Sequence, residues 1–310
     1  NQVITITDDE VPTITCAPDQ TQTADAGLCE AAVTVTAPTS ADNCGVASVL
    51  NDYNGTADAS DNYPVGTTTI TWTVTDNAGL TATCTQDITI TDDELPNAVC
   101  MDITIGLDVS GNASIVGSDI DGGSTDNCAV ASLSALPNAF TSADLGPNNV
   151  TLTVTDVNGN SNTCIAVVTV ADIIPPTALC KDTTVYLDAS GFVAIDPSFV
   201  DDGSFDNAGI DTMFVSPESF DCSAIVGAQS VTLTVRDLSG NESTCTSNVT
   251  VLDTIAPTLT CQDINLYLDL TGNATITPSD VIAAFNDNCP NPLMVIDISA
   301  FSCANVGPNN

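Results

Sequence analysis

The sequence predicts an all-β protein made of tandem β-sandwich repeats, each about 80 residues long. One hairpin pattern, Thr-Val-x-Asp followed by a Gly-bearing turn and a strand that reaches a Cys, occurs at 73–84, 153–164 and 234–245. Apolar residues alternate with Thr beside the turn, which is the period-2 pattern of paired strands. Thirteen cysteines recur with the repeat. Together these three observations predict the fold class.

Each copy contains several short alternating runs without helical periodicity, which predicts a Greek-key sandwich of immunoglobulin-like type. The joints between copies are short and carry an Asp and then a Pro. Because Pro stiffens such connections, we expect an elongated rod. The first residues match the last strand of a repeat, so we expect a piece of a longer chain. The predicted segments are that strand at 1–10, whole repeats at 11–94, 95–174 and 175–256, and an incomplete fourth at 257–310.

The composition excludes several classes of function. With 40 acidic residues, 2 basic residues and no His, the net charge is −38, so we expect no nucleic-acid partner and no attraction to anionic membranes. No apolar run reaches the roughly 18 residues that a membrane helix needs. A His-based catalytic triad is impossible, and the absence of Cys-x-x-Cys argues against zinc and redox sites. We therefore predict that this chain is not an enzyme. The many cysteines predict an oxidising, extracellular location.

An Asp-Asn-Cys centre occurs at 42–44, 126–128 and 287–289, and Val-Gly-Thr-Thr at 65–68 leads into the first hairpin. These spaced landmarks resemble those of the hyalin repeat (HYR) family. The third copy departs from the pattern, with Ala208 in place of the Cys. The resemblance covers essentially the whole chain and implies an immunoglobulin-like extracellular adhesion module. The Thr- and Asp-rich, Lys-poor style is similar to that of giant surface adhesins of gliding Bacteroidota, which the type IX secretion system exports.

Our leading hypothesis is a non-enzymatic extracellular stalk or filament segment of a large cell-surface adhesin, for adhesion or gliding-type attachment. Repetition supports it, because many weak contacts give avidity without a deep pocket. Its partners would be surface ligands or glycans, or other copies of the same filament. Two alternatives stay open: a structural extracellular filament or matrix protein, and the accessory modules of a secreted polysaccharide-degrading enzyme.

The first and last cysteines of each copy recur at fixed positions, which predicts the disulfides Cys16–Cys84, Cys100–Cys164 and Cys180–Cys245. Each would close a long loop and stabilise its unit by roughly 4 kcal/mol. Proximity in the sequence predicts two further pairs, Cys29–Cys44 and Cys289–Cys303. Cys261 has no partner in this scheme. Cys128 and Cys222 are left as free buried thiols or as interchain links.

Calcium is the one cofactor that the sequence suggests, because Ca²⁺ prefers several carboxylate and carbonyl oxygens. The alternative is that these acids only form solvated turns. The three equivalent hairpin residues Asp76, Asp156 and Asp237 are interpreted as turn formers and not as ligands. The candidate ligands are acids at the joints and in two Asp/Gly-rich loops: Asp8, Asp9, Glu10, Asp92, Asp93, Glu94, Asp119, Asp121, Asp126, Asp201, Asp202 and Asp206.

Two smaller predictions concern single residues. Thr183, Thr212 and Thr254 follow an Asp in a pattern that resembles the O-glycosylation signal of Bacteroidota, although ordinary exposed Thr also explains them. Trp72 is the only Trp, and its counterparts in the other copies are Leu152 and Leu233. This equivalence predicts that Trp72 packs in a core and does not stack on a ligand.

Overall fold

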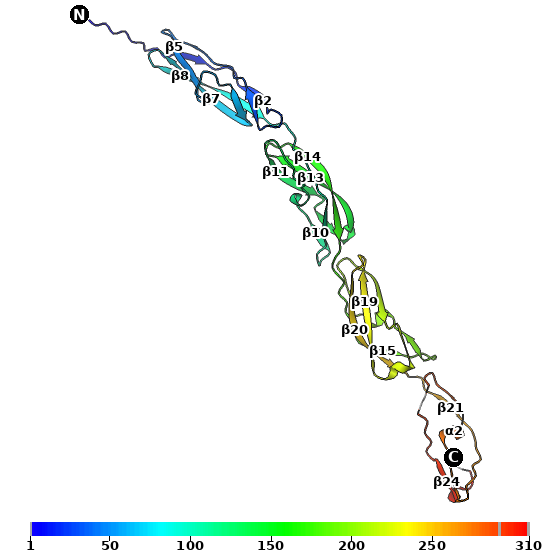
Figure 1. Ribbon diagram of the computed structural model, residues 1–310. Coiled ribbons are helices and arrows are strands. Elements are labelled where there is room, and N and C mark those ends of the chain that lie inside the picture. Colours follow the sequence, from blue (N-terminus) through cyan, green and yellow to red (C-terminus); the bar gives the residue numbers. More distant parts are fainter. Residues whose placement is uncertain (1, 291–292, 309–310) are drawn as a thin grey trace. The chain divides into compact units, whose positions relative to one another are not determined.

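The computed structural model (Figure 1) describes residues 2–290 and 293–308, and the chain divides into two compact units. The first unit is Asn1–Gly106 with Asn112–Ala171, and the second is Leu107–Gly111 with Asp172–Asn310. The outermost residues of the predicted segments 1–10 and 257–310 lie outside the described residues.

The first repeat of unit one has a four-stranded sheet with the order β2-β8-β7-β5. The predicted hairpin is its centre: β7 and β8 are eleven residues each, pair antiparallel and join at a tight turn (Figure 1). Two small pairs, β1-β4 and β3-β6, complete the repeat. The strands are β1 (Thr13–Thr15), β2 (Gln20–Thr23), β3 (Glu30–Val33), β4 (Thr39–Ala41), β5 (Val46–Asn51), β6 (Asp61–Pro64), β7 (Gly66–Asp76) and β8 (Thr81–Thr91).

The second repeat of unit one has the same plan, with a sheet in the order β11-β13-β14-β9 and a pair β10-β12. As β2 does on β8, β9 pairs parallel with the last long strand. The elements are β9 (Ile103–Gly106), β10 (Asn112–Ser114), η1 (Gly117–Asp119), β11 (Val130–Leu136), β12 (Ala139–Thr141), η2 (Ser142–Asp144), β13 (Gly146–Asp156) and β14 (Ser161–Ala171).

Unit two contains a third sandwich and a shorter fourth segment. The third has a sheet in the order β15-β20-β19-β17 and a pair β16-β18, and the fourth has the pairs β21-β23 and β22-β24. The elements are β15 (Thr183–Tyr186), β16 (Phe192–Ala194), α1 (Pro197–Val200), β17 (Ile210–Ser216), β18 (Ser219–Asp221), η3 (Cys222–Ile225), β19 (Ala228–Asp237), β20 (Glu242–Leu252), β21 (Thr258–Cys261), β22 (Asn273–Thr275), α2 (Pro278–Val281), β23 (Ile282–Asn286), β24 (Ala300–Ser302) and η4 (Cys303–Asn305).

Alternate side chains of the long hairpin strands build each core. In β7 the fully buried residues are Ile70, Trp72 and Val74. Ile70 and Trp72 pack with residues of β3, β6 and β8. The prediction for Trp72 is confirmed: the side chain is completely buried, and its indole Nε1 donates to Gln86 Oε1 at 3.3 Å. A large aromatic ring buried in this way is a core residue.

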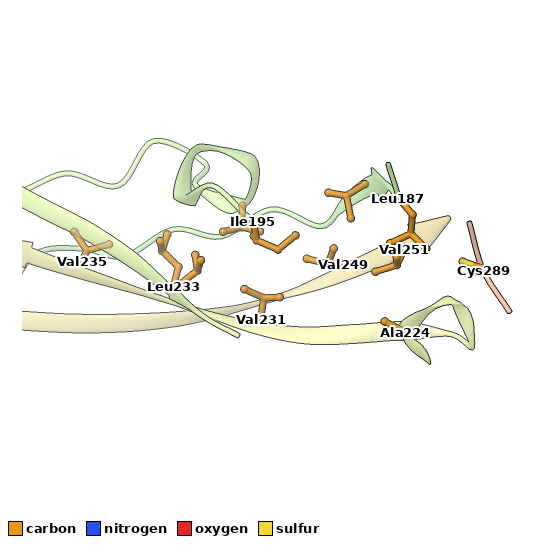
Figure 2. Packing of buried hydrophobic residues seen from close by; sticks show 12 residues of the cluster. Leu187, Ile195, Ala224, Val231, Leu233, Val235, Val249, Val251 and Cys289 are labelled. Atoms are coloured by element: carbon orange, nitrogen blue, oxygen red, sulfur yellow. The ribbon is translucent and has the colours of Figure 1, made fainter. Parts of the chain in front are cut away.

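The core of the third repeat is closed at one end by a residue of the fourth segment. Val231, Leu233 and Val235 of β19 lie in a row within this core (Figure 2). Beyond Val251 and near Ala224, the last side chain of the cluster is Cys289, which is 6% exposed. Within unit two, therefore, neighbouring repeats share a hydrophobic contact.

Each whole repeat contains the long disulfide that the sequence predicts. Cys16–Cys84, Cys100–Cys164 and Cys180–Cys245 are bonded, each with Cα atoms 5.8 Å apart. Each bond fastens the opening segment of a repeat to its last strand, across 64 to 68 residues of chain.

The two short pairings are wrong. Cys29 bonds Cys128 of the next repeat, and Cys222 bonds Cys289 of the next segment; we call these the joint disulfides. Cys44 and Cys303 are exposed free thiols, as is Cys261. The assignment of Cys128 and Cys222 as free thiols or interchain links is therefore also wrong.

The physical reason is the position of each cysteine along its sandwich. Cys44 lies beside the hairpin turn, where its carbonyl accepts a hydrogen bond from Asn77 Nδ2 at 3.0 Å. Cys29 lies at the opposite end of the eleven-residue strands, next to the joint: Asn127 Nδ2 reaches Leu28 O at 3.0 Å. Proximity in the sequence is therefore a poor guide, because the length of a sandwich separates the two thiols.

Candidate functional site

Aspartates from three segments of the chain converge in carboxylate clusters. One cluster joins Asp8, Asp42 and Asp76 in unit one, and another joins Asp172, Asp206 and Asp237 in unit two. In each, one carboxylate oxygen of every residue lies within 4.8 Å of the others. Each cluster combines an Asp of a joint, the Asp of an Asp-Asn pair and the Asp that ends a hairpin strand. We call them the joint clusters.

The hairpin Asp is buried because it continues the core row of its strand. Asp76, Asp156 and Asp237 follow buried Val residues at a spacing of two, and each is no more than 2% exposed. One carboxylate oxygen closes the turn: Asp76 Oδ1 accepts from the backbone nitrogens of residues 78, 79 and 80 at 2.7–2.9 Å. The turn-forming interpretation is confirmed, but burial leaves the second oxygen facing the protein interior.

The hydrogen bonding of the second carboxylate oxygen of the hairpin Asp differs between copies. Asn160 Nδ2 donates to Asp156 Oδ2 at 2.8 Å and also to the joint carbonyl of Asp92 at 3.2 Å. Asn241 makes the same two contacts with Asp237 and Asp172. In the first copy the equivalent residue is a Leu, and Asp76 Oδ2 has no hydrogen-bond partner among the described residues.

In the Asp-Asn pair, only one of the two carboxylate oxygens of the Asp has hydrogen-bond partners. Asp206 Oδ2 accepts from two backbone N–H groups, at 2.7 and 3.1 Å, while its Oδ1 is buried without a partner. Asp126 repeats this arrangement. The neighbouring Asn207 donates from Nδ2 to Asp172 Oδ1 at 3.3 Å, and its own Oδ1 is buried and unpartnered.

The joint Asp completes the cluster. Asp172 is 6% exposed, and its Oδ1 accepts from the backbone N–H of Ile174 and from Asn207. Its Oδ2 has no partner among the described residues, and the same is true of Asp92 Oδ2 and Asp8 Oδ2. Asp253 and Asp287 repeat the first two members in unit two, where Asp287 Oδ1 is unpartnered. Every copy thus buries carboxylate oxygens that no donor in the described part of the chain satisfies.

Such a cluster is electrostatically unfavourable by itself. Two unit charges 4.8 Å apart repel by roughly 3.5 kcal/mol at an effective dielectric constant of about 20. The structure offers little compensation within the described residues: Arg236 pairs with Glu242 at 3.5 Å, and Lys181 acts on Asp201. Unpartnered buried oxygens add a desolvation cost. A carboxylate cluster of this kind can bind a hard cation.

The hairpin Asp of the second repeat has a shifted pKa. Burial raises the pKa of Asp156, but hydrogen bonds from the Asn160 side chain and the turn backbone outweigh it, so the pKa lies below its usual value.

The structure separates the predicted ligands into three sets. Asp8, Asp92, Asp126 and Asp206 belong to the joint clusters or their equivalents. The loop acids are used elsewhere: Asp119 Oδ2 accepts from Val116 N–H, and Asp121 and Asp201 each accept from the N–H and hydroxyl of a Ser three residues on. The remaining candidates are exposed at the surface: Asp9, Glu10, Asp93, Glu94 and Asp202.

Sequence reasoning missed Asp42 and Asp172 and gave the hairpin aspartates no ligand role. The available signal was the phase of the hairpin Asp, which falls on the buried row of its strand. An acid in phase with Val and Leu has to be buried, and burial of a charge needs a partner. The joint residue Asp172 lacks neighbouring acids, since Ala171 precedes it and Ile173 follows it, so the local density of charge that marks Asp8 and Asp92 is absent there.

The candidate glycosylation residues lie in unit two. Thr212 lies on β17 and Thr254 follows β20, and both are exposed. Thr183 begins β15 and is half-buried. Among the described residues, no helix combines the length and apolar character that crossing a membrane requires.

Comparison with known proteins gives a family match. The model of the HYR domain matches residues 7–90 and 171–251. Hyalin of Strongylocentrotus purpuratus is 28% identical over 277 residues, which are 81% of this chain and 21% of that relative. The chain therefore spans about a fifth of that protein.

Solved structures of tandem-domain proteins are also similar. The immunoglobulin domains 1–5 of Sidekick-1 match 79% of this chain and 59% of theirs, with 12% identity and a TM-score of 0.37. Drosophila N-cadherin EC1-4 matches 79% of this chain and 76% of its own, with 12% identity and a TM-score of 0.30.

Proposed function

Since this chain belongs to the HYR domain family, we propose that it is a non-enzymatic, extracellular repeat region of a cell-surface adhesin. The observation that supports this best is that the same sandwich recurs along the chain, each whole copy with its own long disulfide. Disulfides of this kind persist outside the reducing cytosol. Repeated surfaces favour many weak contacts over one catalytic pocket.

The joint disulfides support a load-bearing role. Cys29–Cys128 and Cys222–Cys289 connect neighbouring repeats covalently, in addition to the peptide chain. At these joints, a pulling force along the chain is carried by the disulfide as well as by the peptide backbone. Such bonds suit a stalk that transmits tension between a cell and a surface, since the joint holds even if one connecting segment is strained.

Beads coated with the purified chain test the adhesive role. We expect them to be retained under flow on glycan-coated or cell surfaces, or to aggregate with each other, and reduced and alkylated protein serves as the unfolded control. If native and reduced beads behave alike on every surface, the chain is not adhesive.

A structural filament is the second candidate, and the exposed thiols of Cys44 and Cys303 favour it, because they can join one chain to another. Electron microscopy separates the two: an adhesin stalk gives single fibres, whereas a matrix protein gives lateral bundles.

We also propose that the chain belongs to a surface adhesin of gliding Bacteroidota that the type IX system exports. The Thr- and Asp-rich, Lys-poor composition supports this. Antibody labelling of gliding cells, with and without that secretion system, tests it: surface signal that persists without the system contradicts the proposal.

A further inference from the structure

The joint clusters have a feature that turn formation does not explain. A turn needs one carboxylate oxygen, and the other oxygen would normally face water. Here it is buried and unpartnered at Asp8, Asp42, Asp76, Asp172 and Asp206. The recurrence of the same unsatisfied atoms in separate copies indicates a common ligand.

We propose that each joint cluster binds one divalent cation, which the ligand chemistry identifies as Ca²⁺. The bound ion fixes the joint segment to the sandwich beside it. Two sites are Asp8 with Asp42 and Asp76, and Asp172 with Asp206 and Asp237. The third site comprises the equivalent residues of the second repeat, in which Asp92 and Asp126 lie together and Asp156 is linked to Asp92 through Asn160.

Burial distinguishes these clusters from ordinary surface acids. Asp76 is 2% exposed and Asp172 is 6% exposed, and the Oδ2 atom of each is buried without a partner. Each belongs to a three-carboxylate group whose oxygens lie within 4.8 Å of one another. Buried charges in proteins are either paired or bound to metal, and no Lys or Arg pairs with these.

The distances fit one coordination shell. Calcium–oxygen bonds are about 2.4 Å long, so two oxygens on opposite sides of the ion are about 4.8 Å apart. The carboxylate oxygens of the two three-carboxylate clusters all lie within this distance of one another, so one ion can contact all of them. An unpartnered amide oxygen, Asn127 Oδ1 or Asn207 Oδ1, is available beside the second and third clusters as a further neutral ligand.

The donor set selects the metal. Three carboxylates and an amide oxygen are hard ligands, which suit Ca²⁺, whereas Mg²⁺ usually keeps several waters and takes only one or two carboxylates. The chain contains no His, and Cys128 beside the second cluster is in a disulfide, so it offers no thiolate for zinc.

In the middle site, the hairpin Asp is linked to the other two acids through an Asn side chain. Asp92 and Asp126 lie together, and Asp156 reaches them through Asn160, whose Nδ2 is 2.8 Å from Asp156 Oδ2 and 3.2 Å from Asp92 O. Asn241 has the same two contacts in the cluster of Asp237. From these shared contacts, the proposal gives the hairpin Asp the same role in both sites.

The ligands come from three segments, which gives the site a mechanical consequence. In unit two, Asp172 belongs to the joint, Asp206 to the loop before β17 and Asp237 to the end of β19. A cation that binds all three holds the joint segment against its sandwich. Removal of the ion restores the repulsion and loosens that segment.

Calorimetric titration with CaCl₂ tests the proposal on the intact disulfide-bonded chain, in about 0.15 M NaCl so that diffuse screening is constant. We expect saturable binding at three sites, weaker binding of Mg²⁺, and a chelator-sensitive melting temperature. Asp172→Asn should remove one equivalent of Ca²⁺ or weaken it at least tenfold. Asp172 is a suitable position because an amide can still accept its hydrogen bonds.

Asp201→Asn is the matched control, since it removes the same charge from the same repeat but belongs to a turn that Ser204 satisfies. It should bind Ca²⁺ as the unmodified chain does. Asp8→Asn provides a second test in unit one, where the altered residue lies outside the strands. No saturable binding, or an equal loss in Asp172→Asn and Asp201→Asn, would overturn the proposal. Neither result depends on whether the chain is adhesive.

Discussion

The long disulfide of the first repeat gives a sharp prediction, because Trp72 reports on that repeat alone. Trp72 is the only Trp, is completely buried, and lies opposite Cys84 in the register of β7 and β8. Its fluorescence therefore follows unfolding of this repeat while the other repeats stay silent. The perturbation is the double variant Cys16→Ala with Cys84→Ala.

The expected cost follows from the length of the closed loop. The bond closes 68 residues, and the chain-entropy relation then gives a stabilisation of about 4 kcal/mol at 25 °C. A domain of this size is stable by only about 5–10 kcal/mol, so the variant should lose roughly 40–80% of its free energy of unfolding. Urea titration followed by Trp fluorescence should show the midpoint fall by about the same fraction.

Cys44→Ser is the control, because Cys44 is an exposed free thiol of the same repeat and should leave the midpoint unchanged. A loss of less than about 1 kcal/mol in the double variant would refute the view that this bond supports a small core. It would mean that the sandwich is stable through packing alone.

Three further predictions follow from particular contacts. Gly191→Ala puts a Cβ 2.6 Å from the backbone oxygen of Asn288 and 2.8 Å from Cys222 Sγ, at a φ of +75°. The Cys222–Cys289 bond should therefore fail to form, and thiol titration should find two additional free thiols. An unchanged thiol count would contradict this. Hydrogen bonds from the Ser124 side chain and backbone lower the pKa of Asp121, so Ser124→Ala should raise it. The variant should then be less stable than the parent at pH values above the pKa of Asp121 in the unfolded chain, and equally stable in acid. Melting temperatures measured across this pH range test the prediction. Mild oxidation should join Cys303 of one chain to Cys44 of another, because they are equivalent to the partners of a joint disulfide; peptide mapping that finds Cys44 bonded only to itself would exclude this.

Much of the fold can be predicted from local patterns. Alternation of apolar residues with Thr specifies which side of β7 is buried, and the buried row Ile70, Trp72 and Val74 follows directly. The Asp-x-x-Gly turn fixes the hairpin register, since the Asp carboxylate accepts the turn's N–H groups. These features depend on residues close in sequence, so the sequence carries them clearly.

Pairings between repeats could not be predicted in the same way. The joint disulfide Cys29–Cys128 spans 99 residues, and its formation depends on which end of a sandwich each thiol occupies. That position requires the three-dimensional arrangement of the joint. The joint disulfide is also missing from one joint, because Ala208 of the third repeat stands where Cys128 and Cys289 stand in their copies.

The candidate site was predicted in part for a similar reason. Joint acids such as Asp8 and Asp92 were recognised from their local density of charge. Their partners come from strand ends and loops that are distant in sequence, as Asp237 is from Asp172. The acids of the Asp121 loop have ligand-like spacing, but a Ser hydroxyl already satisfies that carboxylate. Spacing alone does not distinguish a satisfied carboxylate from an unsatisfied one.

Native mass spectrometry of the intact chain, titrated with CaCl₂, tests most directly whether its joints are cation sites. The account predicts three Ca²⁺ ions that bind before any further adducts, and the loss of one in Asp172→Asn but none in Asp201→Asn. A continuous series of adducts without a plateau, identical in both variants, would show that the acids only attract counterions and would contradict the account.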